Sequence, residues 1–227
     1  MSHPKRSKDN RNHSLHYAPE YSPAEGVVYP VMTKQGPLVD SYLDQAYAVF
    51  RKALEHHSRI LAVRFDLHIP RSMTLPDHKE SSQIIRRFLA SIQSKIDANL
   101  KRKQSPHQCP LRYIVAREIG PRNGRVHFHV MLLVNGHAYR QLGTMDSEMP
   151  NLFWMIGEAW ASALGILLEE AINSVQYRFK PGVCQYYLDP LEDYDKLPKA
   201  FHRVSYLCKA QTKHFGQWQR GLMTSKK

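Results

Sequence analysis

The sequence predicts an α+β fold in which an antiparallel sheet carries its helices on one face. Segments with apolar residues at helical spacing alternate along the chain with segments of strand-like composition. Two strand-like segments are joined by a short stretch containing Asn123 and Gly124, which is typical of a hairpin turn. The resulting order is helix, strand, helix, hairpin, helix, short strands, helix. It leaves the second face of the sheet free to carry chemistry.

Four segments are predicted to be helical from the spacing of their apolar residues. Asp40 and Ser41 can cap the start of the first helix. Gly165 is expected to end the third, and Pro198 precedes the fourth. The predicted helices cover residues 41–56, 81–103, 152–165 and 199–213.

Five segments are predicted to be strands. The first alternates apolar and polar side chains from Val63 onward and stops before Pro70. The second and third form the hairpin, and a turn centred on Asn123 places Glu118 directly opposite His127. The predicted strands cover residues 60–69, 111–118, 126–134, 175–179 and 183–188.

Length and composition indicate one folded domain with a tail at each end. A chain of 227 residues is long enough for one sizeable core and too short for two. Residues 1–36 are polar, basic and dotted with proline, so we expect a flexible basic arm there. The domain is expected over residues 37–220, followed by a basic tail over residues 221–227.

The charge balance favours a polyanionic partner. Lys and Arg outnumber Asp and Glu by 32 to 20, which gives a net charge of +12. Nucleic-acid-binding proteins have this property, but so do proteins that bind membrane surfaces. No apolar run reaches the roughly 18 residues that span a bilayer, and the N-terminus lacks the apolar core of a signal peptide. With three cysteines and no C-x-x-C pair, we expect a cytoplasmic protein with reduced thiols and no membrane partner.

Two histidines and a carboxylate form a candidate metal site. His127 and His129 alternate with apolar residues in a strand, so both imidazoles point away from the core. The hairpin register adds Glu118 to the same face. Two His and one carboxylate leave coordination positions open, as a catalytic metal requires. The alternative is a pair of surface histidines, since 13 histidines produce about one H-x-H pair by chance.

A tyrosine and a lysine near the C-terminus form a second candidate constellation. Tyr206 and Lys209 are spaced i, i+3, which places them on one face of a helix. The ammonium can stabilise a phenolate, or the charge that develops when the phenolate attacks a phosphate. Tyr177 and Lys180 repeat the spacing in a predicted strand, where positions three apart face opposite sides. The alternative for Tyr206 is an aromatic side chain that packs on the core.

In this order along the chain, Glu118, His127-Phe128-His129, and Tyr206 with Lys209 resemble the HUH endonuclease superfamily of rolling-circle replication initiators and relaxases. A narrower resemblance is to the inovirus-type replication proteins of filamentous phages and prophages. It rests on residues 57–70, the hairpin, and residues 158–160 and 205–213, and it extends over most of residues 37–220.

The resemblance implies a ferredoxin-like palm, a divalent metal (Mg²⁺ or Mn²⁺) and cleavage of single-stranded DNA. His127, His129 and Glu118 would hold the metal. Tyr206 would be the nucleophile that forms a 5′-phosphotyrosine, and Lys209 would stabilise charge. Some members of the superfamily use two tyrosines. We expect a single tyrosine to act here, but Tyr186 and Tyr187 leave open whether a second one takes part.

The resemblance also implies a partner, which is single-stranded DNA at the replication origin of a phage, prophage or related mobile element. It leaves open whether a host helicase and polymerase are recruited. Two other functions stay open, a non-catalytic nucleic-acid-binding regulator and a single-tyrosine transposase. Basic side chains that could contact the DNA backbone, or be solvated surface charges, are Arg122, Arg125, Lys101, Arg102 and Lys103.

Overall fold

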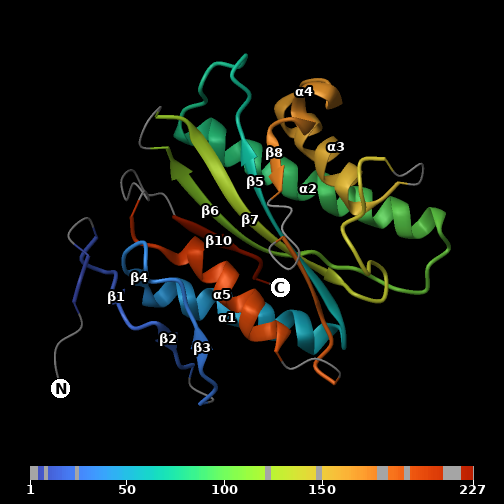
Figure 1. Ribbon diagram of the computed structural model, residues 1–227. Helices are drawn as coiled ribbons and strands as arrows, with labels where there is room; N and C mark the ends of the chain where they lie inside the picture. Colours follow the sequence, from blue (N-terminus) through green and yellow to red (C-terminus); the bar gives the residue numbers. More distant parts are fainter. Residues whose placement is uncertain are drawn as a thin grey trace.

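The computed structural model describes most of the chain and is built around one antiparallel sheet (Figure 1). In the described residues, its strand order is β10-β6-β7-β5-β8, and β9 also pairs with β5. The strands are β5 (Ile60–His68), β6 (Arg112–Ile119), β7 (Val126–Asn135), β8 (Val175–Tyr177), β9 (Gln185–Leu188) and β10 (Leu222–Thr224). The described residues are 5–7, 10–23, 26–120, 124–146, 150–177, 184–191, 195–211 and 221–226.

The hairpin register agrees with the prediction. Glu118 pairs with His127, and Ala116 pairs with His129. Gly124 has a φ of +64°, a left-handed conformation that favours glycine at the end of a tight turn. Residues 121–123, on which the rest of the turn prediction falls, lie outside the described residues. The same holds for residues 178–183 of the two short strand predictions.

Helices cover both faces of the sheet, so the prediction of helices on one face is wrong (Figure 1). Helices α2 (His78–Arg102) and α3 (Leu152–Leu164) pack on one face, with the short α4 (Leu168–Ile172) beside α3. Helices α1 (Asp40–His56) and α5 (Lys196–Ser205) pack on the other. The reason lies in β7, where Met131 and Leu133 follow the histidines on their own face. They are 0 % and 1 % exposed, so most of this face also needs a cover.

Three helix predictions are confirmed with small changes at their ends. Helix α1 begins at Asp40 after Val39, which makes no side-chain cap, so the predicted capping role of Asp40 is wrong. Helix α2 begins earlier than predicted because Asp77 and Glu80 form a reciprocal capping box. Gly165, with a φ of +71°, ends α3 as predicted. No helix in the described ranges is both long and apolar enough to cross a membrane.

The N-terminal segment does not fit the expectation of a flexible arm. In its described part, β1 (Leu15–His16) pairs with β4 (Leu38–Val39), and β2 (Glu20–Tyr21) pairs with β3 (Tyr29–Pro30). Tyr21 and Tyr29 are buried against Phe201 of α5, with ring centroids 5.7 Å and 4.7 Å away. These tyrosines are too widely spaced to form a periodic pattern in the sequence, but each buries a large apolar ring.

The C-terminal segment also differs from its prediction. The expected basic tail contains β10, which pairs with β6 at the edge of the sheet, and Leu222 is 2 % exposed. The expected final helix ends early as well. Helix α5 passes at Ser205 into a single 3-10 turn, Tyr206–Cys208, and Lys209 is extended and bridges to Leu38. Residues 212–220 lie outside the described residues.

Candidate metal centre

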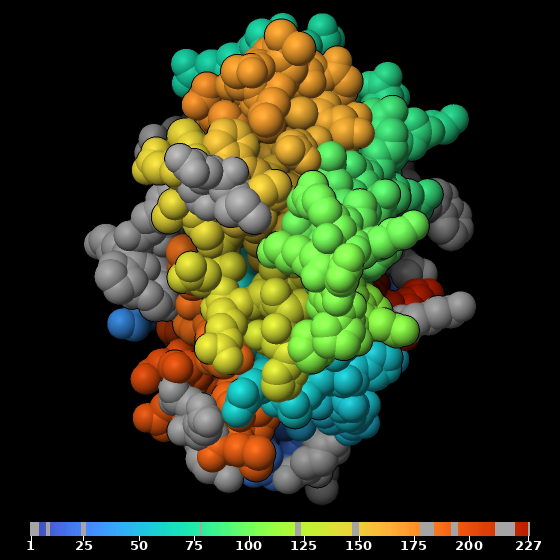
Figure 2. All heavy atoms as spheres, turned by 90° about the vertical axis from the view of Figure 1, so that its right-hand side faces the viewer, coloured from blue at the N-terminus to red at the C-terminus, as the bar shows by residue number. Residues whose placement is uncertain are grey.

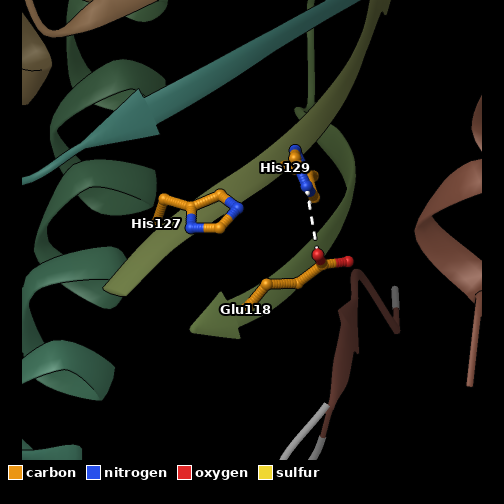
Figure 3. A group of neighbouring side chains, drawn as sticks. All are labelled: Glu118, His127 and His129. Carbon is orange, nitrogen blue, oxygen red and sulfur yellow. Dashed lines mark ion pairs between the residues drawn. The ribbon is translucent and has the colours of Figure 1, made fainter. Parts of the chain in front are cut away.

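The three predicted metal ligands converge on one point at the end of the hairpin. Glu118 comes from β6, and His127 and His129 come from β7 (Figure 3). Each offers a ligand atom, and these atoms all lie within 4.8 Å of one another. Glu118 and His129 are 2 % and 6 % exposed, while His127 is half-buried. The strand pairing alone creates this arrangement, because directly opposed residues of a hairpin project from the same face.

His129 is oriented by a carboxylate that the sequence analysis did not single out. Its Nδ1 contacts Asp66 Oδ1, and Arg64 donates to the same oxygen over 2.5 Å. An Arg64 nitrogen also lies 2.9 Å from His129 Nδ1. Because Arg64 pairs with Asp66 and keeps its carboxylate anionic, we assign the proton to Nδ1, from which it is donated to Asp66. Burial alone would raise the pKa of Asp66, but the hydrogen bond from His129 and the charge of Arg64 outweigh it and hold the pKa well below its usual range.

When His129 is neutral with its proton on Nδ1, its Nε2 faces the Glu118 carboxylate as an acceptor. The distance from Nε2 to Oε2 is 3.3 Å, and this buried Nε2 has no hydrogen-bond partner. Two acceptors this close are stabilised by a cation or a proton between them. Ligand atoms that each lie about 2.1 Å from one metal ion are about 3.0–3.4 Å apart. The residues therefore fit a divalent cation, and Asp66 has the place of the carboxylate that commonly orients a metal-bound histidine.

His127 is held neutral, which keeps it available as a ligand. Burial, together with the neighbouring His129, lowers the pKa of His127 to about 4. The ring of His68 stacks on it, with centroids 5.3 Å apart and planes inclined by 7°. His68 lies opposite His127 in the pairing of β5 with β7, and Asp66 lies opposite His129. The sequence carried a signal for both residues, because Asp66 and His68 are the polar positions of an alternating strand.

Tyr206 and Lys209 reach the same cluster from the helical layer that covers this face of the sheet. Lys209 Nζ donates to the Tyr206 hydroxyl over 2.8 Å and lies 2.9 Å from Glu118 Oε2. The Tyr206 ring meets the His129 ring edge to face at 5.2 Å between centroids. Burial alone would lower the pKa of Lys209, but the Tyr206 hydroxyl and the Glu118 carboxylate raise it, so the ammonium is retained. The predicted pairing is therefore present, although a 3-10 turn followed by extended backbone brings it about in place of an α-helix.

The other tyrosines considered as nucleophiles lie elsewhere. Tyr177 packs against Phe65 and Phe153, in the core on the opposite face of the sheet, and burial raises the pKa of its phenol. Tyr186 and Tyr187 pair with the first residues of β5. Asp66, the β5 residue beside His129, is four positions beyond the partner of Tyr186, which corresponds to about 13 Å along a strand. Lys180, the partner in the second Y-x-x-K copy, lies outside the described residues.

Of the predicted DNA contacts that the structure describes, Arg125 lies beside the cluster, two residues from His127, whereas residues 101–103 lie away from it. Arg125 donates to three carbonyl oxygens of the segment after β5, those of Ile69, Pro70 and Met73, so its guanidinium is engaged within the chain. Residues 101–103 are exposed at the far end of α2, where Asn99 accepts a hydrogen bond from Tyr139. That end lies beside the segment after β7, seen in yellow in Figure 2. Arg122 falls outside the described residues.

A groove gives access to the cluster from the side of His127. Its volume is about 780 Å³, and its walls include His68, Arg71, Glu170 and Gln176. These walls carry both hydrogen-bond donors and acceptors. An extended polar chain could therefore lie in the groove and reach the histidines.

These features define an α+β protein with a carboxylate and two histidines gathered beneath a tyrosine–lysine pair. The family model of the YagK/YfjJ C-terminal domain matches residues 26–222, and the chain belongs to this family. Similar proteins of Escherichia coli (strain K12) are the Uncharacterized protein YagK and the Uncharacterized protein YfjJ. YagK is 33% identical over 175 residues, 72% of this chain and 82% of YagK. YfjJ is 31% identical over 207 residues, 84% of this chain and 96% of YfjJ. No solved structure is significantly similar.

Proposed function

We propose that the chain is an HUH-type endonuclease that nicks and rejoins single-stranded DNA and so starts rolling-circle replication of a phage, prophage or related mobile element. One observation carries the proposal. The Lys209 ammonium contacts both the Tyr206 hydroxyl and the Glu118 carboxylate, at 2.8 Å and 2.9 Å. It thereby joins a potential nucleophile to a potential metal ligand. The proposal also assigns the sheet to the ferredoxin-like palm of that superfamily.

Glu118, His127 and His129 would hold Mg²⁺ or Mn²⁺, and the bound cation would supply a Lewis acid for the scissile phosphate. The carboxylate of Glu118 would be shared between this cation and the Lys209 ammonium. Imidazole ligands favour Mn²⁺ by intrinsic affinity, whereas abundance in the cell favours Mg²⁺.

In the proposed reaction, the Tyr206 oxygen attacks the phosphorus atom in line with the 3′-oxygen that leaves. A phosphorus–oxygen bond forms to the tyrosine and one breaks to the 3′-oxygen, which receives the phenolic proton. Lys209 stabilises the phenolate from 2.8 Å. The 5′-phosphotyrosine retains the energy of the broken bond, so rejoining needs no nucleotide cofactor. The free 3′-hydroxyl is a primer for a host polymerase.

The direct test is a search for the covalent intermediate. The full chain is incubated with a pool of single-stranded DNA and Mn²⁺, and protein-linked DNA is isolated under denaturing conditions. Peptide mass spectrometry is expected to find the trimmed nucleotide on Tyr206. A nucleotide on Tyr186 or Tyr187 would overturn the assignment of the nucleophile. If folded protein binds the pool but forms no adduct with any strand, the nuclease function is wrong and a non-catalytic binding module replaces it.

A further inference from the structure

A second groove lies on the other face of the sheet from the metal centre. Its volume is about 850 Å³, and it runs between α2 and strands β6 and β10. Arg117 lines it, whereas the next residue, Glu118, belongs to the metal centre. Successive residues of a strand project from opposite faces, so the sheet separates the two sites. An occupant of this groove and a ligand at the metal centre could be bound at the same time.

The floor of the groove is apolar and mostly aliphatic. Ile85 and Leu89 of α2 and Val115 of β6 contribute to it, as does Met223 of β10, which is partly exposed. The floor also includes two aromatic rings, of which Phe128 is 1 % exposed and Tyr113 is partly exposed. Five of the seven apolar side chains that line the groove are aliphatic, and Tyr113 gives a nucleobase a single ring to stack on, so the floor favours a peptide with aliphatic side chains.

The rim of the groove is cationic. Arg86, Arg117 and Lys226 line it, and no Asp or Glu does so among the residues that the structure describes. Elsewhere basic side chains have acidic partners, as Lys95 has in Glu158 at 2.9 Å. In the described part of the chain, no carboxylate forms an ion pair with the three rim cations.

Arg117 is the most constrained of these cations. It is half-buried and donates from Nε to the Ser81 hydroxyl over 3.0 Å, a neutral partner. Partial burial has removed some of the hydration that stabilises its charge. An incoming carboxylate would restore that stabilisation, and arginine binds carboxylates through paired hydrogen bonds.

From the aliphatic floor and the unpaired cationic rim, we propose that this groove docks an acidic peptide segment of a partner protein. Leucine-like side chains of the peptide lie on the floor, and its Asp and Glu side chains pair with Arg86, Arg117 and Lys226. The volume of about 850 Å³ falls within the range of about 300–1,000 Å³ that is usual for binding pockets. Neither the floor nor the rim depends on the proposed nuclease activity.

The test uses a fluorescein-labelled synthetic peptide in which Asp and Glu alternate with Leu, and the full chain as the receptor. A second peptide replaces each Leu by Ser. Fluorescence anisotropy is expected to show saturable binding of the Leu peptide and much weaker binding of the Ser peptide. Arg86→Glu should weaken binding of the Leu peptide at least tenfold. Met223→Gln, which makes the floor polar, should weaken the Leu peptide and leave the Ser peptide unchanged.

Lys101→Glu is the matched control, because Lys101 is also an exposed cation of α2 but does not line the groove. If Lys101→Glu weakens peptide binding as much as Arg86→Glu does, the binding is general charge attraction and the proposal fails. If Arg86→Glu weakens binding of labelled oligothymidylate but not of the peptide, the groove binds nucleic acid and the proposal also fails. Adduct formation by the same variants is measured separately. A loss of peptide binding with intact adduct formation separates this site from the nuclease.

Discussion

The two faces of strand β7 show how one strand supports two kinds of structure. On one face, Phe128 and Val130 are 1 % and 0 % exposed, and the apolar side chains continue along the whole strand. On the other face, Met131 and Leu133 are equally buried, but the first half carries His127 and His129. The apolar face anchors the strand, while the half-polar face presents side chains that the anchored backbone holds in place. Substitutions on the two faces should therefore have different consequences.

The largest expected effect is on chemistry, at Tyr206. Tyr206→Phe keeps the ring that meets His129 and removes only the hydroxyl that accepts from Lys209. Covalent adducts with single-stranded DNA should disappear, because no oxygen remains to attack the phosphate. Tyr177→Phe is the control, since Tyr177 lies in the core on the other face. Adduct formation is measured on denaturing gels with Mn²⁺ present, and an adduct with Tyr206→Phe would contradict the assignment.

The second effect concerns the metal centre. Replacing His127 and His129 together with Ala removes two of the three converging ligands and leaves Asp66 paired with Arg64. Cleavage should fall below detection, and EDTA should have the same effect on the unaltered chain until Mn²⁺ is added. Affinity for single-stranded DNA should stay within about threefold, because Lys and Arg contacts to phosphates dominate it. Unchanged cleavage by the folded double variant would remove the metal centre from the mechanism.

The third prediction compares stability across β7. Phe128→Ala should lower the free energy of unfolding by about 3–5 kcal/mol, because it leaves a cavity between the sheet and Trp160. His127→Ala, at the half-buried position next to it, should cost about 1 kcal/mol. Urea unfolding followed by circular dichroism measures both. Equal losses would mean that the histidine face contributes as much to the fold as the apolar face does.

The sequence predicted the elements whose signals are local. The hairpin register follows from one turn and the alternation of two strands, so the pairing of Glu118 with His127 was accessible. The second helical layer was not, because the cover over Met131 and Leu133 comes from chain segments distant in the sequence. The same limit applies to β10, whose three residues have no periodicity before they pair with β6. Tyr206 and Lys209 were paired correctly for a geometric reason that proved wrong, since the turn between them is not α-helical.

The smallest expected effect on activity is at Asp66, which the sequence analysis missed. Asp66→Asn keeps the size of the side chain but replaces a pure acceptor for His129 Nδ1–H by an amide that can also donate. In the variant, His129 would populate the other tautomer, which carries its proton on Nε2. That nitrogen is the one that faces Glu118, so it would be less available to a metal. Metal affinity should fall about 10–100-fold, which is usual when the partner of a metal-bound histidine is lost. A high Mn²⁺ concentration can compensate for weaker metal binding but not for a missing ligand. Activity should therefore recover at high Mn²⁺ in Asp66→Asn and stay absent in the double histidine variant. Titration of cleavage against Mn²⁺ measures both, and an unchanged Mn²⁺ requirement in Asp66→Asn would show that Asp66 does not orient His129 for a metal.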